Sequence, residues 1–236
     1  METNKIDQQL KECGVKFLPW IGKDYEKGLT YNKEGKLILP NDQQNGKKIL
    51  VLGEYHYIED DVYDPHEDSW TLFTRKVMDD FLGNTIRQRW MNTFVKFERS
   101  IFGRIINREE SRDVWNHLAF YNYVQVPVSH TNRIPSKNDY VISAIPFFET
   151  LLDISPDIII AWGKSLYWNL PESHEQLMIK GNEGEKIKID NHEVQTWVYH
   201  LEKNSKTVIL ISVANPSTSY SWEFWNQVIK KGIENA

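Results

Sequence analysis

Apolar runs alternate with polar loops along this chain. The clearest run covers residues 207–213 and stops at Asn215-Pro216-Ser217, and a second covers 48–52 and stops at Gly53-Glu54. Unbroken β-branched and aliphatic runs are typical of strands that are buried on both faces, as in a parallel sheet. Two further runs predict strands over residues 118–126 and 157–162. The chain therefore carries four candidate strands of one buried sheet.

Between these strands, apolar residues recur at the spacing of helices. The periodicity predicts helices over residues 71–82, 86–102, 140–152, 164–170 and 222–231. Residues 194–200 suggest one additional strand, whereas the polar stretch 171–191 is expected to be an excursion from the core. Strands that alternate with helices imply a sheet covered on both faces. We therefore expect a three-layer α/β/α fold around a central, mostly parallel, four-stranded sheet.

The first part of the chain differs from the rest. Residues 1–46 are polar and rich in Lys, Gly and Asn, so we expect an N-terminal extension packed on the core. Residues 47–236 would then form the α/β domain. A chain of 236 residues with 40% hydrophobic residues is long enough to bury one large core.

The charge of the chain bears on whether the protein binds nucleic acid. A formal net charge of -5 argues against a whole-surface electrostatic grip on nucleic acid. A local basic face is still predicted on helical sequence, formed by Arg87, Arg89, Lys96, Arg99, Arg104, Arg108 and Arg112. The alternative is a solvated helix face whose cations pair with Glu98, Glu109 and Glu110.

Metal sites, secretion and membrane insertion are not indicated. Cys13 is the single cysteine, which excludes an intrachain disulfide and a cysteine-ligated cluster. Residues 59–68 are rich in acids, but their spacing does not match a calcium loop, so we expect an exposed acidic loop. The chain has no signal-peptide pattern and no apolar run of membrane-spanning length. We expect a cytoplasmic protein without metal or cofactor.

Polar residues stand where the predicted strands end. In open α/β sheets the carboxyl ends of the strands form the ligand site. The expected site residues are Gly53, Glu54, Tyr55, His56, Tyr57, Asn122, Asn215, Pro216 and Ser217. Each has an alternative role, since Asn-Pro-Ser is also ordinary turn chemistry and Glu54 could cap a helix. Asn122 is unusual because Asn is disfavoured in strands and costly to bury unpaired.

The order of these motifs is similar to that of a known family. With Gly53-Glu54, Asn122, Trp162-Gly163-Lys164 and Asn215-Pro216-Ser217 in sequence, residues 48–232 resemble the uracil-DNA glycosylase superfamily. The Asn-Pro-Ser loop resembles that of the mismatch-specific branch, and Gly-Glu resembles the first motif of the thermophile branch. The resemblance implies a uracil-DNA glycosylase-like fold. It also implies a hydrolase that removes a damaged or deaminated, uracil-type base from DNA during base-excision repair.

This chemistry suggests roles for the candidate residues. Breaking an N-glycosidic bond develops positive charge on the sugar, so a carboxylate is needed, and Glu54 would supply it. His56 or the Asn215 amide would donate to the departing base. Tyr55 or Tyr57 would stack on a flipped base, and Asn122 would read its hydrogen-bonding edge.

Two other functions remain open on the sequence. Tyr55-His56-Tyr57 stands where the family has a small pair such as Pro-Gly, which favours a catalytically inactive nucleic-acid or nucleotide-binding module of the same fold. A nucleotide-handling hydrolase would fit the acidic loop, but the chain has no phosphate-binding glycine loop.

Overall fold

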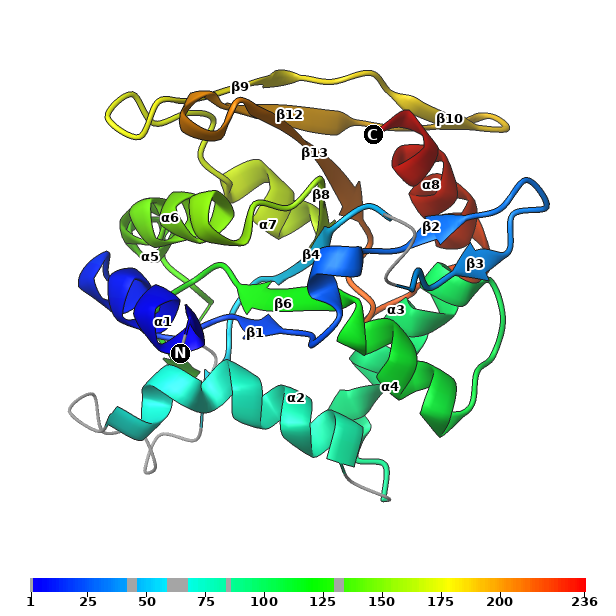
Figure 1. The fold of residues 1–236 in the computed structure, drawn as a ribbon, viewed down its shortest axis with the longest axis horizontal. Helices are drawn as coiled ribbons and strands as arrows, with labels where there is room; N and C mark the ends of the chain where they lie inside the picture. The colour runs from blue at the N-terminus through cyan, green and yellow to red at the C-terminus, as the bar shows by residue number, and fades with distance from the viewer. Residues whose placement is uncertain (1, 42–45, 59–67, 84–85, 130–133) are drawn as a thin grey trace.

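The computed structural model describes residues 2–41, 46–58, 68–83, 86–129 and 134–236. The acidic loop expected over 59–68 lies outside the described residues except for Asp68. Figure 1 shows the arrangement, with the central sheet enclosed by helices.

Seven strands form the central sheet, and its four inner strands are parallel. In spatial order they are β1 (Trp20–Ile21), β6 (Leu118–Asn122), β4 (Ile49–Gly53), β8 (Ile158–Trp162), β13 (Lys206–Val213), β12 (Thr196–Leu201) and β9 (Ile179–Glu183). Strand β4 pairs in parallel with β6 and β8, and β8 pairs in parallel with β13. The four predicted strands are confirmed. The predicted count of four is wrong, because β1, β12 and β9 extend the sheet by antiparallel pairing.

The added strands lie towards the two edges, where sequence signals are weak. The strand suggested over residues 194–200 is confirmed as β12. In β9 three of the five residues are exposed, and this strand lies within 171–191, where we expected an excursion without strands. An edge strand pairs through its backbone and tolerates polar side chains. The polarity of this stretch therefore reflects exposure rather than irregular structure.

Alternate residues of the inner strands face two separate cores. In β4, Ile49 and Val51 join one hydrophobic cluster, while Leu50 and Leu52 join the other. Strand β8 divides in the same way, with Ile158 and Ile160 opposite Ile159. Because successive side chains of a strand point to opposite faces, strands this apolar must be covered on both sides.

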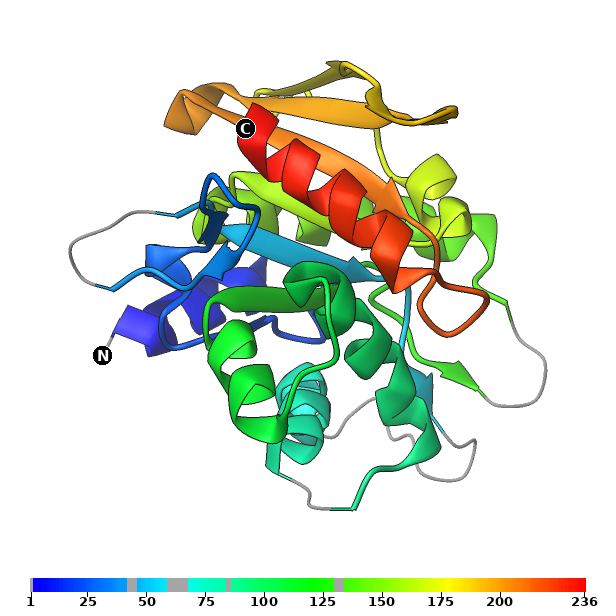
Figure 2. The same ribbon diagram turned by 90° about the vertical axis from the view of Figure 1, so that its right-hand side faces the viewer.

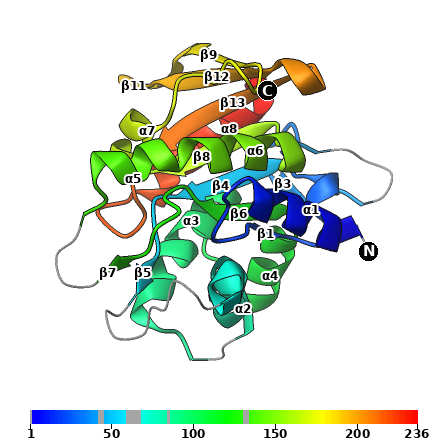
Figure 3. The same ribbon diagram turned by 90° about the vertical axis from the view of Figure 1, so that its left-hand side faces the viewer.

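Helices supply both covers, so the fold is mixed α/β with helices on each face of a mostly parallel sheet. One layer, facing the viewer in Figure 2, contains α2 (Phe73–Gly83), α3 (Asn92–Phe102), α4 (Arg108–Asn116) and α8 (Trp222–Asn235). The other, facing the viewer in Figure 3, contains α1 (Glu2–Glu12), α5 (Lys137–Ile142), α6 (Ala144–Ile154) and α7 (Lys164–Asn169). The described ranges also contain three small two-stranded sheets: β2 (Thr30–Tyr31) with β3 (Leu37–Ile38), β5 (Tyr57–Ile58) with β7 (Val128–Ser129), and β10 (Ile187–Ile189) with β11 (His192–Val194).

Several predicted elements have different bounds from those expected; α8, for example, continues to Asn235 instead of ending at residue 231. Strand β6 ends at Asn122 instead of residue 126, and α3 begins at Asn92 instead of residue 86. The helix expected over 140–152 is divided into α5 and α6 at Ser143. The Ser143 hydroxyl donates to the Asp139 carbonyl and accepts from the Gln125 amide, so a tertiary contact stabilises the break.

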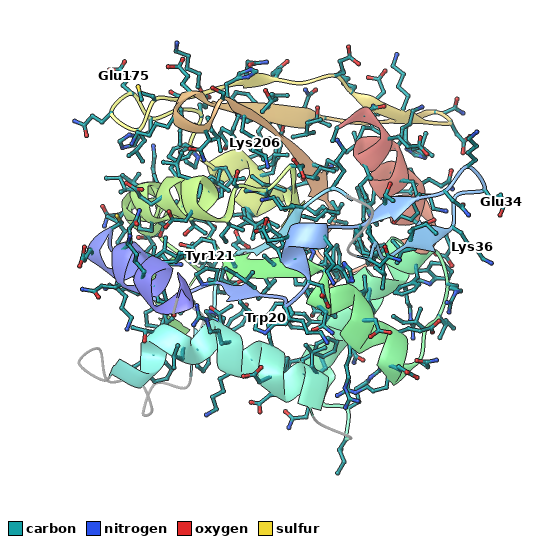
Figure 4. The ribbon with its side chains drawn as sticks, in the orientation of Figure 1. Trp20, Glu34, Lys36, Tyr121, Glu175 and Lys206 are labelled. Carbon is teal, nitrogen blue, oxygen red and sulfur yellow. The ribbon has the colours of Figure 1, made fainter. Side chains whose placement is uncertain are left out.

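The N-terminal segment is part of both cores. Leu10, Leu18 and Tyr25 are buried in the cluster beneath α6, and Leu29 is buried in the opposite one. Trp20 of β1, labelled in Figure 4, places its ring edge against Trp115 with 6.3 Å between ring centroids. Residues 1–46 therefore do more than overlie the domain, since they add a strand and core side chains.

A buried carboxyl group joins α3 to α4 and makes stability depend on pH. Glu98 is 2% exposed and accepts hydrogen bonds from Ser111 Oγ at 2.7 Å and Trp115 Nε1 at 3.3 Å. Burial raises the pKa of Glu98 to about 7. The folded state therefore holds this proton over a pH range in which the unfolded chain has lost it. Stability from this group is lost as pH rises from about 4.5 to about 7.

We expect Glu98→Gln to remove this pH dependence and to stabilise the protein at pH 8. The amide keeps an oxygen for the two donors without the cost of a buried charge, so the free energy of unfolding should rise by about 1 to 3 kcal/mol. Urea denaturation at pH 5 and pH 8 measures the effect, with exposed Glu234→Gln as the matched control. Equal stabilisation at both pH values would show that Glu98 does not titrate in this range.

Candidate functional site

A pocket of about 540 Å³ lies where the inner strands end. The chain passes from β4 to β6 on one side of it and then crosses back past β4 to β8 on the other side, which reverses the strand order. Ligands of open α/β sheets bind at such a switch point. The pocket is lined by eight of the nine expected site residues, namely Gly53, Glu54, Tyr55, His56, Tyr57, Asn122, Asn215 and Ser217. Pro216 is buried and lines the adjoining groove described below.

The loop after β4 is held in place by backbone hydrogen bonds. Carbonyls of Gly53 and Glu54 accept from Tyr123 and Val124, each at 2.9 Å, and the His56 carbonyl accepts from Val128 at 3.0 Å. The short parallel pair of β5 and β7 continues this contact. The segment after Asn122 thus supports the loop, and this fixes the side chains of the first motif at the pocket.

Glu54 is anchored by a tyrosine from the helix layer. Tyr140 Oη donates to Glu54 Oε1 at 2.5 Å. Burial and the hydrogen bond to Glu54 raise the pKa of Tyr140 to about 12, so the phenol remains protonated at neutral pH. Glu54 caps none of the described helices, and strand β5 follows it in the chain. Its carboxylate is oriented by one neutral donor and lines the pocket, which suits a group that stabilises developing positive charge.

His56 orients Asn122 from inside the protein. Asn122 Nδ2 donates to His56 Nδ1 at 3.0 Å, and the opposite ring nitrogen bonds to Thr74 Oγ1 at 2.9 Å. The rings of Phe17 and Phe73 meet His56 edge-on, with centroids 5.1 and 4.9 Å away. Burial lowers the pKa of His56 to about 3, so the ring is uncharged at neutral pH.

This geometry changes the expected role of His56. We expected it as one candidate donor to a departing base, but both ring nitrogens are already bonded within the protein. A neutral ring whose N–H is used internally cannot protonate a ligand. His56 is instead a positioning residue that holds the Asn122 amide in one orientation.

The amide of Asn122 lies against the backbone of Gly53. A Cβ atom at Gly53 would be 2.1 Å from Asn122 Oδ1, so only glycine fits at the end of β4. Asn122 is 5% exposed, and its Oδ1 has no hydrogen-bond partner within the described part of the chain. Because this oxygen is not among the buried side-chain atoms that lack a partner, it is reachable from the pocket, where it can accept from a ligand N–H group.

The Asn215-Pro216-Ser217 loop is both a turn and a wall of the pocket. Asn215 Oδ1 accepts from the Ser217 amide at 2.9 Å, and the Asn215 carbonyl accepts from Thr218 at 3.0 Å. Ser221, not Ser217, caps α8. The side-chain oxygen of Asn215 is used in the turn. Its Nδ2 group lies next to Gly163 and therefore remains available as a donor.

Aromatic rings form the remaining walls. Tyr55 and Tyr57 meet edge to face at 4.9 Å and share a hydrogen bond of 2.7 Å between their hydroxyls. The buried Trp162 Nε1 has no hydrogen-bond partner among the described residues. Several lining residues come from helical segments and could not be predicted from the sequence, because nothing local links them to the strand ends: Phe73, Lys76, Asp80, Trp90, Thr93 and Phe94.

A basic groove of about 790 Å³ adjoins this pocket. The groove and the pocket share three lining residues, Trp90, Thr93 and Ser217. The cations of the groove are Arg87, Arg89, Lys96 and Arg99. None of the three arginines forms an ion pair or a side-chain hydrogen bond within the described ranges, and Lys96 donates to the Thr218 carbonyl at 3.0 Å. Charges that are not neutralised by the protein are available to an anionic ligand.

The predicted basic face is therefore divided. Arg104 pairs with Glu110, as the alternative of a salt-bridged helix face expected. Arg108 and Arg112 donate to the carbonyls that end α2, at Phe81 and Leu82. These three side chains stabilise the packing of helices, whereas the other four line the groove.

Across the described residues, no group of three or more His, Cys, Asp or Glu side chains is arranged to hold a metal ion. Among the described helices, none combines the length and apolar composition needed to cross a membrane. Models of known protein families give no match to this chain, and no curated protein sequence matches it.

Proposed function

We propose that this protein binds a nucleic-acid strand in the basic groove and a base of that strand in the pocket, as a DNA glycosylase-like hydrolase. One observation carries the proposal: a pocket with a carboxylate and two amides opens onto four cations through the shared residues Trp90, Thr93 and Ser217. A phosphate backbone needs such cations, and a base rotated out of its stack needs an aromatic pocket with edge-reading groups. The uracil-DNA glycosylase-like fold is part of the same proposal.

Glu54 would carry out the chemistry. Its carboxylate would stabilise positive charge on the sugar as the N-glycosidic bond breaks and would orient the attacking water. The departing base would take a hydrogen bond from Asn215 Nδ2, and Lys76 at the pocket wall would add positive charge. His56 would act only through Asn122.

Asn122 would select the base through its unused oxygen. The His56 bond fixes Nδ2 away from the ligand, so the amide presents an acceptor and requires an N–H on the base. Uracil and hypoxanthine carry an N–H on the edge used for pairing, as an acceptor of this kind requires. A base without that N–H would leave the acceptor unpaired, which commonly costs about 1 to 3 kcal/mol.

A second function is favoured by the tyrosines. The side chains of Tyr55 and Tyr57 line the pocket with Glu54, and their hydroxyls are hydrogen-bonded to each other. They narrow the space through which a water molecule must approach the sugar. A module that binds a flipped base without hydrolysing it would need the groove, Asn122 and the aromatic walls. It would not need the carboxylate of Glu54.

Base rotation can be measured independently of hydrolysis. We expect an oligonucleotide carrying 2-aminopurine beside uracil or hypoxanthine to brighten when the protein binds, because removal of the neighbour from the stack relieves quenching. Asn122→Ala should reduce the signal and Glu54→Gln should keep it. Tight binding without any brightening would contradict the pocket's role.

A further inference from the structure

A second, smaller pocket lies between α7 and the outer strands β9 and β12. Its volume is about 190 Å³, and it shares no residue with the pocket at the strand ends. Four of its lining residues are aromatic and two are acidic: Tyr167, Trp168, Trp197, Tyr199, Glu172 and Glu183. Among the residues that the structure describes, no lysine or arginine lines it.

Internal contacts fix the inner rings of this pocket. Tyr199 Oη donates to the Pro171 carbonyl at 2.7 Å. A Cβ atom at Gly181 would be 2.4 Å from Trp197 Nε1, so this glycine allows the indole to lie against β9. The centroids of the Trp197 and Tyr199 rings are 6.5 Å apart, at 64° between planes. These walls are held in place before any ligand binds.

The outer ring is exposed and nearly perpendicular to its neighbour. Tyr167 and Trp168 have centroids 5.1 Å apart and planes at 78°, and Trp168 is 75% exposed. Because Trp168 both lines the pocket and is exposed, its ring is accessible to a ligand from solvent. Rings set at steep angles present several π faces to one volume, as in sites that recognise quaternary ammonium groups.

The charge of the pocket is negative. Glu172 and Glu183 are exposed, and their carboxylates form no ion pair or hydrogen bond with any residue that the structure describes. The nearby Lys180 does not neutralise them, because its Nζ is held by Glu202 at 2.6 Å. Two unpaired carboxylates beside aromatic rings in one pocket favour a cation over an anion or a neutral ligand.

We infer that this pocket binds an organic cation, a quaternary ammonium or methylated amine. Water occupies roughly 30 Å³ per molecule, so the volume corresponds to about six waters, which suits a small headgroup rather than a nucleotide. The aromatic faces attract the charge and also contact the methyl groups, while Glu172 and Glu183 supply the counter-charge. The site is independent of the function proposed for the strand-end pocket.

Calorimetric titration of the full chain with choline at low ionic strength tests the inference. We expect binding of choline, and weaker binding by at least about tenfold of its neutral isostere, in which carbon replaces nitrogen. Trp168→Ala should weaken choline binding about 3- to 5-fold, and the double variant Glu172→Gln/Glu183→Gln should weaken it about tenfold. These side chains are exposed, so the variants should fold.

Glu175→Gln is the matched control, because Glu175 is an exposed acid in the loop before β9, labelled in Figure 4, and does not line the pocket. A peptide carrying trimethyllysine, titrated beside choline, distinguishes a protein side chain from a free small molecule as the source of the cation. Failure of both ligands to bind at about 10 mM, or equal affinity for the neutral isostere, would overturn the inference.

Discussion

Glu54→Gln is expected to lower base excision by about 100-fold or more while leaving oligonucleotide affinity nearly unchanged. Glutamine keeps the shape of the side chain and an oxygen that can accept from Tyr140, whose hydroxyl is 2.5 Å from Glu54 Oε1 in the wild type. It cannot stabilise positive charge on the sugar. Single-turnover cleavage measures the rate, and fluorescence anisotropy measures the affinity.

Asp80→Asn is the matched control for this experiment. Asp80 is the other carboxylate that lines the described pocket, and it projects from α2 instead of a strand end. We expect its substitution to change the rate by no more than about threefold, because an exposed carboxylate has a small effect at a distance. If Asp80→Asn abolished excision and Glu54→Gln retained it, Glu54 would be removed from the mechanism.

The triple variant Arg87→Gln/Arg89→Gln/Arg99→Gln should weaken oligonucleotide binding on the order of 100-fold at low salt. Each arginine that neutralises a phosphate releases about one counterion, so the slope of log affinity against log salt should become shallower by about 2 to 3. The loss of affinity should come from the groove itself, because these three guanidinium groups form no ion pair with any described residue and are available to phosphates. Anisotropy at several salt concentrations measures both quantities.

A variant with the same change in net charge serves as its control. Lys33, Lys36 and Lys203 are exposed and do not line the groove, and Lys36 is labelled in Figure 4. Their replacement by Gln should leave the salt slope within about one unit of the wild type. An equal loss of affinity in both triple variants would mean that net charge, and not the groove, attracts the strand.

The inner sheet and the strand-end loops could be predicted because their signals are local. Residues 48–52 and 157–162 are continuous apolar runs, and a polar motif follows where β4 ends. The partners of the site could not be predicted in this way. Thr74 reaches His56 from α2, and Trp90 reaches the pocket from the 3₁₀ turn just before α3, so only tertiary packing brings them there.

The errors have similar physical causes. Strand β9 was missed because an edge strand is stabilised by backbone pairing with β12 while its side chains stay polar. The role of His56 was misassigned because its chemistry depends on burial between Phe17 and Phe73, which lowers its pKa to about 3. Neither burial nor pairing is visible in the residue types themselves.

Formation of abasic sites is the direct test of glycosylase activity. Purified protein would be incubated with single- and double-stranded oligonucleotides carrying uracil, hypoxanthine, xanthine or mispaired thymine, and the products would be cleaved at abasic positions. We expect strand cleavage on at least one base that carries an N–H on its pairing edge, with the Glu54→Gln protein inactive on the same substrate. Absence of cleavage by the wild type on every substrate would contradict the glycosylase function and favour a binding module of the same site.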